Sequence, residues 1–492
     1  MLIRLALFLA CALLGAFLPS LPSHAQEEAL EPVVFIPGIL GSRLEDGKGV
    51  VWGDALAMVR RFPDLRLSFD EPEKTELRAT EILSTVGILG PFKVGQYSGI
   101  RKTFKELGFV EGKDLFYFPY DWRQSNFVTA ERLRAFIESK KELAGRKITI
   151  VAHSMGGLVA HIYLHDHGGA RNTTKLVTLG TPHLGSADSV WTLWNGLGQL
   201  KDFVLGGEAQ VRRTVFSFAS MYELLPTYDR CCILGAPGDA ARTPTNILDF
   251  SNWLKYRWIP GDIDGAAARK FIGGSLARAA RLNEIITGPR PKNVRFIKIA
   301  GDLFKTYTRV YFDGRSGAPV RWDQFGGDGT VPLVSAAANE LGDSDTAIHV
   351  HSTIFDDEHV KLKLRRVLTR YNPLDQYAYQ AVEGIVEVGP DKEFRKVRAI
   401  DISPGESYQQ TGGNAVLRAR VEDEDGQAIK GVEVKAWLNP AGEPARALVV
   451  EQSADGDYVA RYTTPAAPGM HKITLEIPGL GTFEDYFVAL TR

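Results

Sequence analysis

Cysteine is scarce in this sequence, which has three cysteines among 492 residues. Cys11 lies in an apolar N-terminal run, whereas Cys231 and Cys232 are adjacent to each other. Adjacent cysteines cannot join distant segments, so the sequence excludes a disulfide-stapled scaffold, and their spacing does not fit a zinc site. A strained disulfide between the two and a pair of buried thiols both stay open.

Long apolar runs and an excess of one charge are also lacking. The apolar run at residues 5–18 is shorter than the ~18 residues that a membrane-spanning helix usually needs. The 58 basic and 59 acidic residues give a formal net charge of −1, so no broad basic surface is available for nucleic acid. The sequence contains no nucleotide-binding loop or metal-binding motif. We therefore expect no cofactor, no metal and no nucleic-acid partner.

Residues 1–25 have the pattern of a secretory signal peptide. Arg4 precedes the apolar run, and the small residues Ser23 and Ala25 stand where a signal peptidase reads them. Cys11 comes too early in the run for a lipoprotein signal. The sequence thus predicts an exported protein, periplasmic or secreted, whose mature chain begins near Gln26.

Residues 26–390 are predicted to form one α/β domain. Short β-branched or aromatic runs alternate with stretches of helical spacing, which is typical of a parallel sheet covered on both faces. The strand-like runs lie at residues 33–36, 115–118, 147–152, 176–179, 294–300 and 347–351.

The strand pattern lapses between about residues 186 and 290, which predicts a helical cap. Apolar residues there, including Val190, Leu193 and Trp194, follow helical spacing, and a second aromatic cluster lies at residues 253–258. Two interpretations are open for this apolar face. It packs on the sheet, or it forms a lid that lines an acyl pocket or meets a lipid interface.

From about residue 396 the pattern changes to alternation with a period of two, as in Leu417, Ala419 and Val421. Turn signals at regular intervals separate four such runs. This pattern predicts an all-β, immunoglobulin-like sandwich over residues 396–492. The acidic segment 423–425 is interpreted as a hairpin turn rather than a calcium site.

Residues 147–165 predict a nucleophile elbow, in which an apolar strand, a sharp turn at Ser154 and an apolar helix follow one another. The turn forces the serine into a strained backbone conformation that presents its hydroxyl at the sheet edge. Ala152 replaces the first glycine of G-x-S-x-G and is still small. This context indicates an α/β-hydrolase fold with Ser154 as its nucleophile.

A serine hydroxyl needs a histidine to take its proton and a carboxylate to orient that histidine. Asp328, in a glycine-rich loop, is the predicted acid, and Asp302 competes because it directly follows a predicted strand. His359, between a loop and a predicted helix, is the predicted base. His349 and His351 stay as alternatives, although both fall in a predicted strand.

Eight segments together resemble the lecithin:cholesterol acyltransferase family, which also contains lysosomal phospholipases and phospholipid:diacylglycerol acyltransferases. The resemblance spans about residues 32–365, and the segments stand in the family's order. They are residues 32–45, Trp52, residues 120–123 (Tyr-Asp-Trp-Arg), 153–156 (His-Ser-Met-Gly), 180–183 (Gly-Thr-Pro-His), 220–226 and 327–331, and His359.

The resemblance implies a triad of Ser154, Asp328 and His359 and an oxyanion hole formed by the backbone N–H groups of Ile39 and Met155. These positions agree with elementary chemistry, because one amide follows the nucleophile and the other follows the first strand.

The resemblance also implies a mobile lid around Trp52 and a site lined by Tyr120, Asp121, Trp122 and Arg123. Animal members of the family close the lid loop with cysteines, which are missing here between Cys11 and Cys231. The C-terminal sandwich is not implied by the family.

The predicted activity is acyl ester hydrolysis or O-acyl transfer on lipids or phospholipids through an acyl-serine, with transient contact to a membrane surface. Two other functions stay open: an esterase for non-lipid esters, and a non-catalytic surface-binding protein on a hydrolase scaffold. The C-terminal module is expected to bind an unknown partner or a substrate surface.

Overall fold

The computed structural model describes residues 30–490 except 85, 88–92, 95–96, 197–204, 236–241, 314–317, 339–343, 348, 370–383, 390–392, 398, 404–407 and 424–426. The predicted signal peptide, part of the predicted cap and the tip of the acidic turn lie outside the described residues. Among the helices of the described part, none combines the length and the apolar character needed to cross a membrane.

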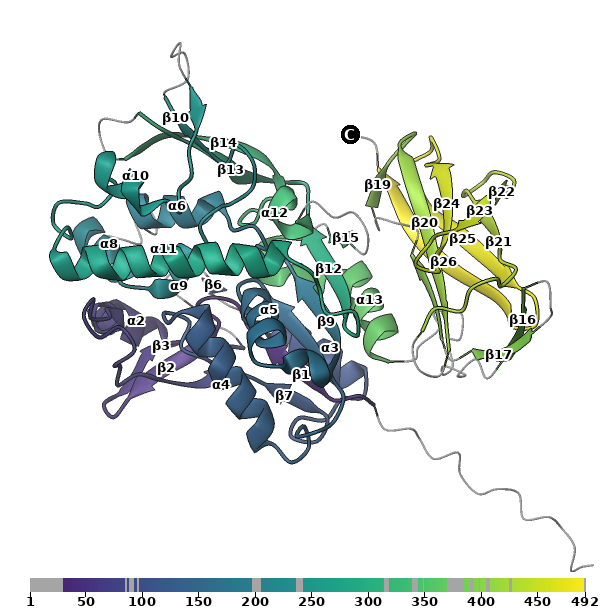
Figure 1. Ribbon diagram of the computed structural model, residues 1–492, viewed down its shortest axis with the longest axis horizontal. Coiled ribbons are helices and arrows are strands. Elements are labelled where there is room, and N and C mark those ends of the chain that lie inside the picture. The colour runs from purple at the N-terminus through teal and green to yellow at the C-terminus, as the bar shows by residue number, and fades with distance from the viewer. Residues whose placement is uncertain are drawn as a thin grey trace, which may run out of the picture. The chain divides into compact units, whose positions relative to one another are not determined.

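A six-stranded sheet forms the centre of the α/β part (Figure 1), and all neighbouring strands in it run parallel. Every residue of β1 and β8 is buried. Because successive side chains of a strand point to opposite faces, the sheet is covered on both sides there, as the continuous apolar runs predict. In spatial order the strands are β15 (Ser344–Ala347), β12 (Arg295–Gly301), β9 (Thr173–Leu179), β8 (Ile148–His153), β1 (Val33–Ile36) and β7 (Leu115–Tyr117).

The helix α5 (Gly156–Asp166) packs on β1, β8 and β9, and α4 (Asn126–Ser139) packs beside α5. The helix α3 (Ser98–Glu106) contacts the 3₁₀ helix η3 (His351–Asp356), as does α13 (Glu358–Leu368). This parallel sheet, with a strand–turn–helix at Ser154, is an α/β-hydrolase-like arrangement.

The last strand of the sheet differs from the prediction. We expected a strand at residues 347–351, but β15 ends at Ala347, where its pairing with β12 also ends. The Asp302 N–H donates to the Ala347 carbonyl, and the His351 N–H donates to the Asp328 carbonyl. His351 therefore lies beyond the carboxyl end of the strand, next to the loop that carries Asp328.

A small three-stranded sheet, in the order β3, β2, β4, follows β1. Asp54 caps the helix after β3 by accepting hydrogen bonds from two backbone N–H groups, which explains why α2 begins at Ala55. The elements of this segment are β2 (Ser42–Asp46), β3 (Gly49–Trp52), α2 (Ala55–Arg61), η1 (Phe62–Leu65), β4 (Arg78–Ile82), β5 (Val86–Gly87) and β6 (Lys93–Val94).

The predicted cap contains the expected helices, and its aromatic residues face inward. Trp194, Trp253 and Trp258 are almost fully buried, and the rings of Trp194 and Trp253 lie 5.4 Å apart. These tryptophans pack in the core rather than at an exposed lid surface. The helices are α6 (Ala187–Asn195), α8 (Glu208–Val215), α9 (Ala219–Glu223), α10 (Phe250–Lys255) and α11 (Ala266–Thr287).

A second sheet, which the sequence pattern does not predict, lies over this region in the order β11, β10, β13, β14. Its strands β10 (Cys232–Leu234) and β11 (Thr243–Pro244) are too short to give a periodic signal. The hairpin β13 (Phe304–Phe312) and β14 (Pro319–Gly327) lacks clean alternation because β14 is mostly exposed. The predicted cap region therefore contains two short strands, β10 and β11, besides its helices.

Cys231 and Cys232 lie at the start of β10, and both are buried free thiols with their sulfur atoms 2.8 Å apart. Of the two alternatives left open by the sequence, the structure contains the thiol pair. Burial raises the pKa of Cys232 well above its usual value.

The C-terminal strands form two sheets with an apolar core between them, which confirms an all-β module. The core already includes Val386 and Val388, which precede residue 396. One sheet has the order β18 (Ala399–Ser403), β20 (Asn414–Glu422), β24 (Tyr458–Thr463), β23 (Val450–Gln452). The other has the order β19 (Tyr408–Gln410), β26 (Gly481–Leu490), β25 (Gly469–Ile477), β21 (Lys435–Asn439), β22 (Arg446–Leu448), and β16 (Gly384–Val388) pairs with β17 (Glu393–Val397).

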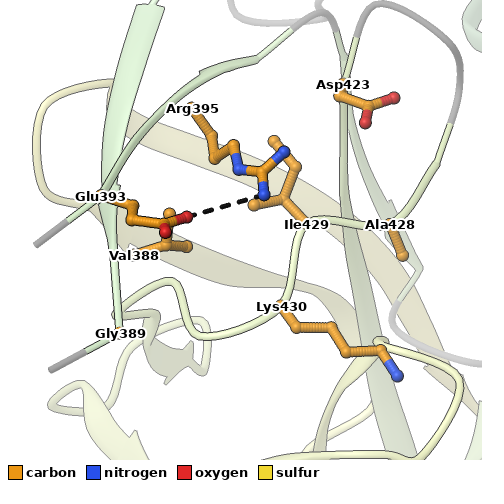
Figure 2. A pocket seen from close by; sticks show the side chains of 8 residues that line it. All are labelled: Val388, Gly389, Glu393, Arg395, Asp423, Ala428, Ile429 and Lys430. Atoms are coloured by element: carbon orange, nitrogen blue, oxygen red, sulfur yellow. Dashed lines mark ion pairs between the residues drawn. The ribbon is translucent and has the colours of Figure 1, made fainter. Parts of the chain in front are cut away.

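The C-terminal module has a pocket of about 400 Å³ beside the β16–β17 hairpin (Figure 2). Two of its charges, Glu393 and Arg395, form an ion pair at 3.6 Å. The other two are also engaged, because Asp423 accepts from the Gln427 N–H and Lys430 donates to the Ala454 carbonyl. Each of these four side chains therefore already has a partner within the module.

Candidate active site

Ser154 occupies the sharp turn between β8 and α5 with a φ of 54°, in the left-handed region. Its N–H donates to the Leu179 carbonyl at 2.9 Å, which helps to hold a backbone conformation that costs a non-glycine residue about 1–3 kcal/mol. A Cβ at Gly156 would approach the Pro37 carbonyl oxygen to 2.5 Å, and one at Gly157 would approach Thr181 Oγ1 to 2.1 Å. The glycines after the serine therefore permit the close contact of helix and strand that the elbow requires.

A chain of hydrogen bonds joins Ser154, His351 and Asp328. The distance from Ser154 Oγ to His351 Nε2 is 2.8 Å, and that from His351 Nδ1 to Asp328 Oδ2 is 2.7 Å. The second Asp328 oxygen accepts from the N–H groups of Thr330 and Val331. Because the carboxylate only accepts, Nδ1 carries the proton and Nε2 is free to receive the serine proton. The three side chains therefore have the mutual arrangement that a nucleophile, a base and an orienting acid need for acyl transfer.

The predicted base, His359, does not take part in this chain, and the expectation is corrected to His351. His359 lies in the first turn of α13, where its N–H donates to the Asp357 side chain. His351 reaches the serine because β15 ends four residues before it and the chain then turns toward Asp328. The competing acid, Asp302, accepts a hydrogen bond from the Leu303 N–H.

The charge of Asp328 governs the titration of His351. Burial lowers the pKa of His351, but the charge and hydrogen bond of Asp328, with a contribution from Asp188, outweigh burial and raise it above its usual value. The neighbouring His153 shows the opposite balance, because burial and the nearby His351 lower its pKa to about 3.

The two predicted oxyanion donors flank the serine. Met155 follows Ser154 at the start of α5, and the backbone of Gly38 lies so close that a Cβ there would stand 2.7 Å from the Ser154 Cβ. Within the described part of the chain, the N–H groups of Ile39 and Met155 have no hydrogen-bond acceptor. Both amides are therefore available to a developing oxyanion.

The predicted lid residue Trp52 packs in the core, where it is 3 % exposed and meets Trp122 edge to face at 5.2 Å. Its indole N–H donates to the Leu40 carbonyl, and the Tyr120 hydroxyl donates to the Pro37 carbonyl. These bonds hold the loop that carries Ile39 from both sides. The expectation of a mobile lid around Trp52 stays a prediction.

Asp121 and Arg123 form a buried ion pair at 2.7 Å. Arg123 also donates to the Leu65 carbonyl at the end of η1 and to Thr75 Oγ1, so it ties the 120–123 segment to η1 and to the segment after it. The contacts described here are structural, and a direct contact of residues 120–123 with substrate stays a prediction.

Two residues near the triad were missed by the analysis of the sequence. Tyr97 hydrogen-bonds to both Gly38 and His153, and His153 hydrogen-bonds to His351. The motif around Ser154 already contains His153, whereas Tyr97 stands in no recognisable motif. In the described residues, no group of three or more His, Cys, Asp or Glu side chains could hold a metal ion.

The comparisons with known proteins agree with the motifs. A family model described as lecithin:cholesterol acyltransferase matches residues 51–241, a region that includes Ser154 but not Asp328 or His351. Phospholipase A(1) LCAT3 of Arabidopsis thaliana is 32 % identical over 48 % of this chain, which spans 60 % of that protein's length.

Two further relatives match over longer stretches. Lecithin-cholesterol acyltransferase-like 4 of Arabidopsis thaliana is 27 % identical over 87 % of this chain and 92 % of its own length. The human lysosomal phospholipase A and acyltransferase is 25 % identical over 67 % of this chain and 85 % of its own length. The chain is therefore related to the lecithin:cholesterol acyltransferase family, and the resemblance that its motifs predict is confirmed.

Proposed function

We propose that this protein is a serine-dependent acyl ester hydrolase or O-acyltransferase that acts on lipids or phospholipids. The observation that carries the proposal is the hydrogen-bond chain from Ser154 through His351 to Asp328 at a nucleophile elbow. The kinship with proteins named as phospholipases and acyltransferases supports a lipid ester as the substrate.

In the first step, Ser154 Oγ attacks the ester carbonyl carbon while its proton passes to His351 Nε2. Asp328 stabilises the imidazolium, and the amides of Ile39 and Met155 donate to the oxyanion of the tetrahedral intermediate. Collapse of the intermediate breaks the bond to the alcohol, which leaves with the proton from His351. An acyl-serine remains on the enzyme.

In the second step, water or an acceptor alcohol gives its proton to His351 Nε2 and attacks the acyl-serine carbonyl. Collapse returns the proton to Ser154 Oγ and releases a fatty acid or a new ester. Which acceptor dominates depends on how well the closed site excludes water.

Apolar side chains on the segments that build the site support contact with a lipid surface. Leu303 is the second residue after β12, Phe325 precedes the Asp328 loop, and Val350 precedes His351. All three side chains are more than 40 % exposed. Exposed apolar residues that gather on functional segments are typical of interaction sites. We propose that they meet the membrane or lipid particle during turnover.

We further propose export by the leader at residues 1–25, a catalytic domain that begins at residue 26 and has a cap at about 186–290, and an immunoglobulin-like module that begins with β16 rather than at residue 396. The two facing sheets and their common apolar core support the immunoglobulin-like assignment. In this proposal the module binds a partner or a substrate surface.

The test is mass spectrometry of the products that purified protein releases from mixed phospholipid and neutral-lipid vesicles, with and without a long-chain alcohol. Ser154→Ala and His351→Gln should abolish product formation, whereas His359→Gln should retain it. The last variant separates the histidine that contacts Ser154 from the one that the sequence motif suggests.

Free fatty acid that depends on Ser154 supports the hydrolase, and new alcohol esters support the transferase. Product only from short soluble esters would indicate a non-lipid esterase. Vesicle binding that survives Ser154→Ala, with no product from any ester, would overturn the proposal in favour of a binding protein.

A further inference from the structure

We propose that Tyr97 and His153 form a positioning relay that couples the oxyanion loop to the catalytic histidine, and that turnover depends on it. This inference rests on the proposed function. Three hydrogen bonds make up the relay: Gly38 N to Tyr97 Oη at 2.8 Å, Tyr97 Oη to His153 Nδ1 at 2.9 Å, and His153 Nε2 to the His351 carbonyl oxygen at 2.9 Å.

The direction of every bond in the relay follows from the groups at its ends. The His351 carbonyl only accepts, so His153 Nε2 must carry a proton and donate. In the neutral imidazole, His153 Nδ1 is then an acceptor, and the Tyr97 hydroxyl donates to it. The Gly38 N–H donates to the same hydroxyl oxygen. The relay therefore runs from Gly38 through Tyr97 and His153 to His351 with one consistent arrangement of protons.

Burial keeps this arrangement in place. Tyr97 is 2 % and His153 is 5 % exposed, and the Phe355 ring packs 5.7 Å from Tyr97 and 5.6 Å from His153. The low pKa of His153, about 3, keeps its imidazole neutral at the pH where the catalytic histidine works. Each relay group has a single buried partner on either side, so the loss of one group leaves an unsatisfied polar atom.

Both ends of the relay lie next to groups that take part in the proposed reaction. Gly38 precedes Ile39, whose N–H is the oxyanion donor on the loop, and the Gly38 backbone touches Ser154. The His351 carbonyl belongs to the residue whose imidazole accepts the serine proton. The relay thus fixes the donor and the base relative to the nucleophile by contacts that a substrate need not make. Such preorganisation raises kcat and leaves substrate binding largely unchanged.

Tyr97→Phe tests the relay, because it removes the hydroxyl and keeps the ring packing. We expect kcat for a soluble ester to fall by about 10- to 100-fold with KM nearly constant, since the affected groups act only on the developing charge and the proton transfer. Tyr117→Phe is the matched control, because Tyr117 also packs against Phe35 and is absent from the relay.

Substitutions of His153 distinguish the effects of the two hydrogen bonds that its ring makes, one to Tyr97 and one to the His351 carbonyl. His153→Gln places an amide near the Nε2 position and can still donate to the His351 carbonyl, whereas His153→Asn reaches only the Tyr97 side. We expect the glutamine variant to retain more activity than the asparagine variant. Adding Tyr97→Phe to His153→Asn should cost less than the product of the two separate losses, because both changes break the same relay.

The rate at which a fluorophosphonate labels Ser154 is measured for every variant, together with the thermal midpoint. This rate does not depend on which ester is the natural substrate. Slower labelling and a lower kcat in Tyr97→Phe, both measured well below its thermal midpoint, together with a normal Tyr117→Phe control, support the relay. Equal rates in Tyr97→Phe and the parent, or fully multiplicative losses in the double variant, overturn it. If the parent is labelled but turns over no lipid, the proposed function fails while the labelling rates still decide on the relay, and an unlabelled parent overturns both.

Discussion

At the scale of single residues, the site depends on how the Asp328 carboxylate controls the orientation and protonation of the His351 imidazole. Asp328 is 1 % exposed and has its two oxygens occupied by three donors, so it holds both the ring orientation and the tautomer of His351. Because the pKa of His351 is raised, its protonated form stabilises the fold below the ordinary value of 6.5, and that stabilisation is lost as the pH rises through the folded pKa. Activity follows the opposite course, since only the neutral ring accepts the serine proton.

We therefore expect kcat/KM to rise with pH along a limb that lies above the ordinary histidine value. Asp328→Asn should move this limb to lower pH, because burial then acts on His351 without the opposing charge, and should lower kcat by about 10⁴-fold. Asp302→Asn serves as the control and should leave the limb and the rate nearly unchanged. The measurement is the pH profile of kcat/KM on a soluble ester. A rising limb at the same pH in Asp328→Asn and the parent would contradict the assignment of Asp328 as the acid that orients His351.

Gly38 offers a second test at this scale. A Cβ at this position would stand 2.7 Å from the Ser154 Cβ and 3.2 Å from its Oγ, so Gly38→Ala must displace the nucleophile or the oxyanion loop. A displacement of about 1 Å at such a site costs about 100-fold in rate, and we expect at least that loss in kcat. Gly47→Ala, in open space, is the control. Full turnover by Gly38→Ala would show that the loop does not lie against the serine during catalysis.

The site residues that could be predicted from the sequence are those whose position in the fold is determined by a local sequence motif. Ser154 could be predicted because strand, turn and helix are contiguous around it, and Asp328 because a glycine-rich loop presents it. His351 could not be assigned, because its place depends on where β15 stops pairing with β12, and an apolar run does not mark that point. Tyr97 comes close to the site only through tertiary packing, so no local sequence pattern predicts its position there.

At the scale of elements, a buried carboxylate joins three helices. Glu223 at the end of α9 is fully buried and accepts from Ser125 Oγ at 2.5 Å and from the Asn126 N–H at 2.7 Å, at the start of α4. Arg278 of α11 lies 3.5 Å away. Burial raises the pKa of Glu223, against the lowering effects of these partners. As the pH rises above 4.5, the unfolded chain therefore loses this proton first, and the carboxyl contributes less to stability.

Glu223→Ala should lower the free energy of unfolding by about 3 kcal/mol, because it leaves buried donors at the start of α4 without an acceptor. Glu223→Gln, which keeps one acceptor, should cost less. Glu208→Ala removes an exposed carboxylate of α8 and should have little effect. Urea unfolding of the three variants tests the ranking, and equal stabilities for Glu223→Ala and Glu208→Ala would refute this role.

The cap shows why some elements escape prediction. Its helices have enough turns to repeat an apolar stripe, and their aromatic residues are buried as the packing interpretation requires. The strands β10 and β11 have three and two residues, and β10 pairs with β13, whose partner residues lie 78 positions later in the chain, as in Cys232 and Val310. Pairing at that distance leaves no periodic trace in either segment.

At the scale of the whole molecule, the question is which exposed apolar residues meet a lipid surface. Leu303 and Phe325 are 59 % and 54 % exposed on segments that lead to the triad, whereas Phe394 and Val449 are 72 % and 80 % exposed in the C-terminal module. An apolar residue that enters the interface during turnover contributes about 1.5–3 kcal/mol of transfer free energy if it is fully buried there. The paired variant Leu303→Ser/Phe325→Ser should therefore lower kcat/KM on phospholipid vesicles by at least about 10-fold and leave a soluble ester almost unaffected.

The matched control is Phe394→Ser/Val449→Ser, which removes the same kind of surface from the C-terminal module. If only the first pair reduces the rate on vesicles, the catalytic part itself contacts the lipid, and the module has another role. If only the second pair does so, the module docks the enzyme to its substrate surface. Because the soluble ester reports on the triad alone, equal losses on both substrates would instead mean that Leu303 and Phe325 support the fold of the site.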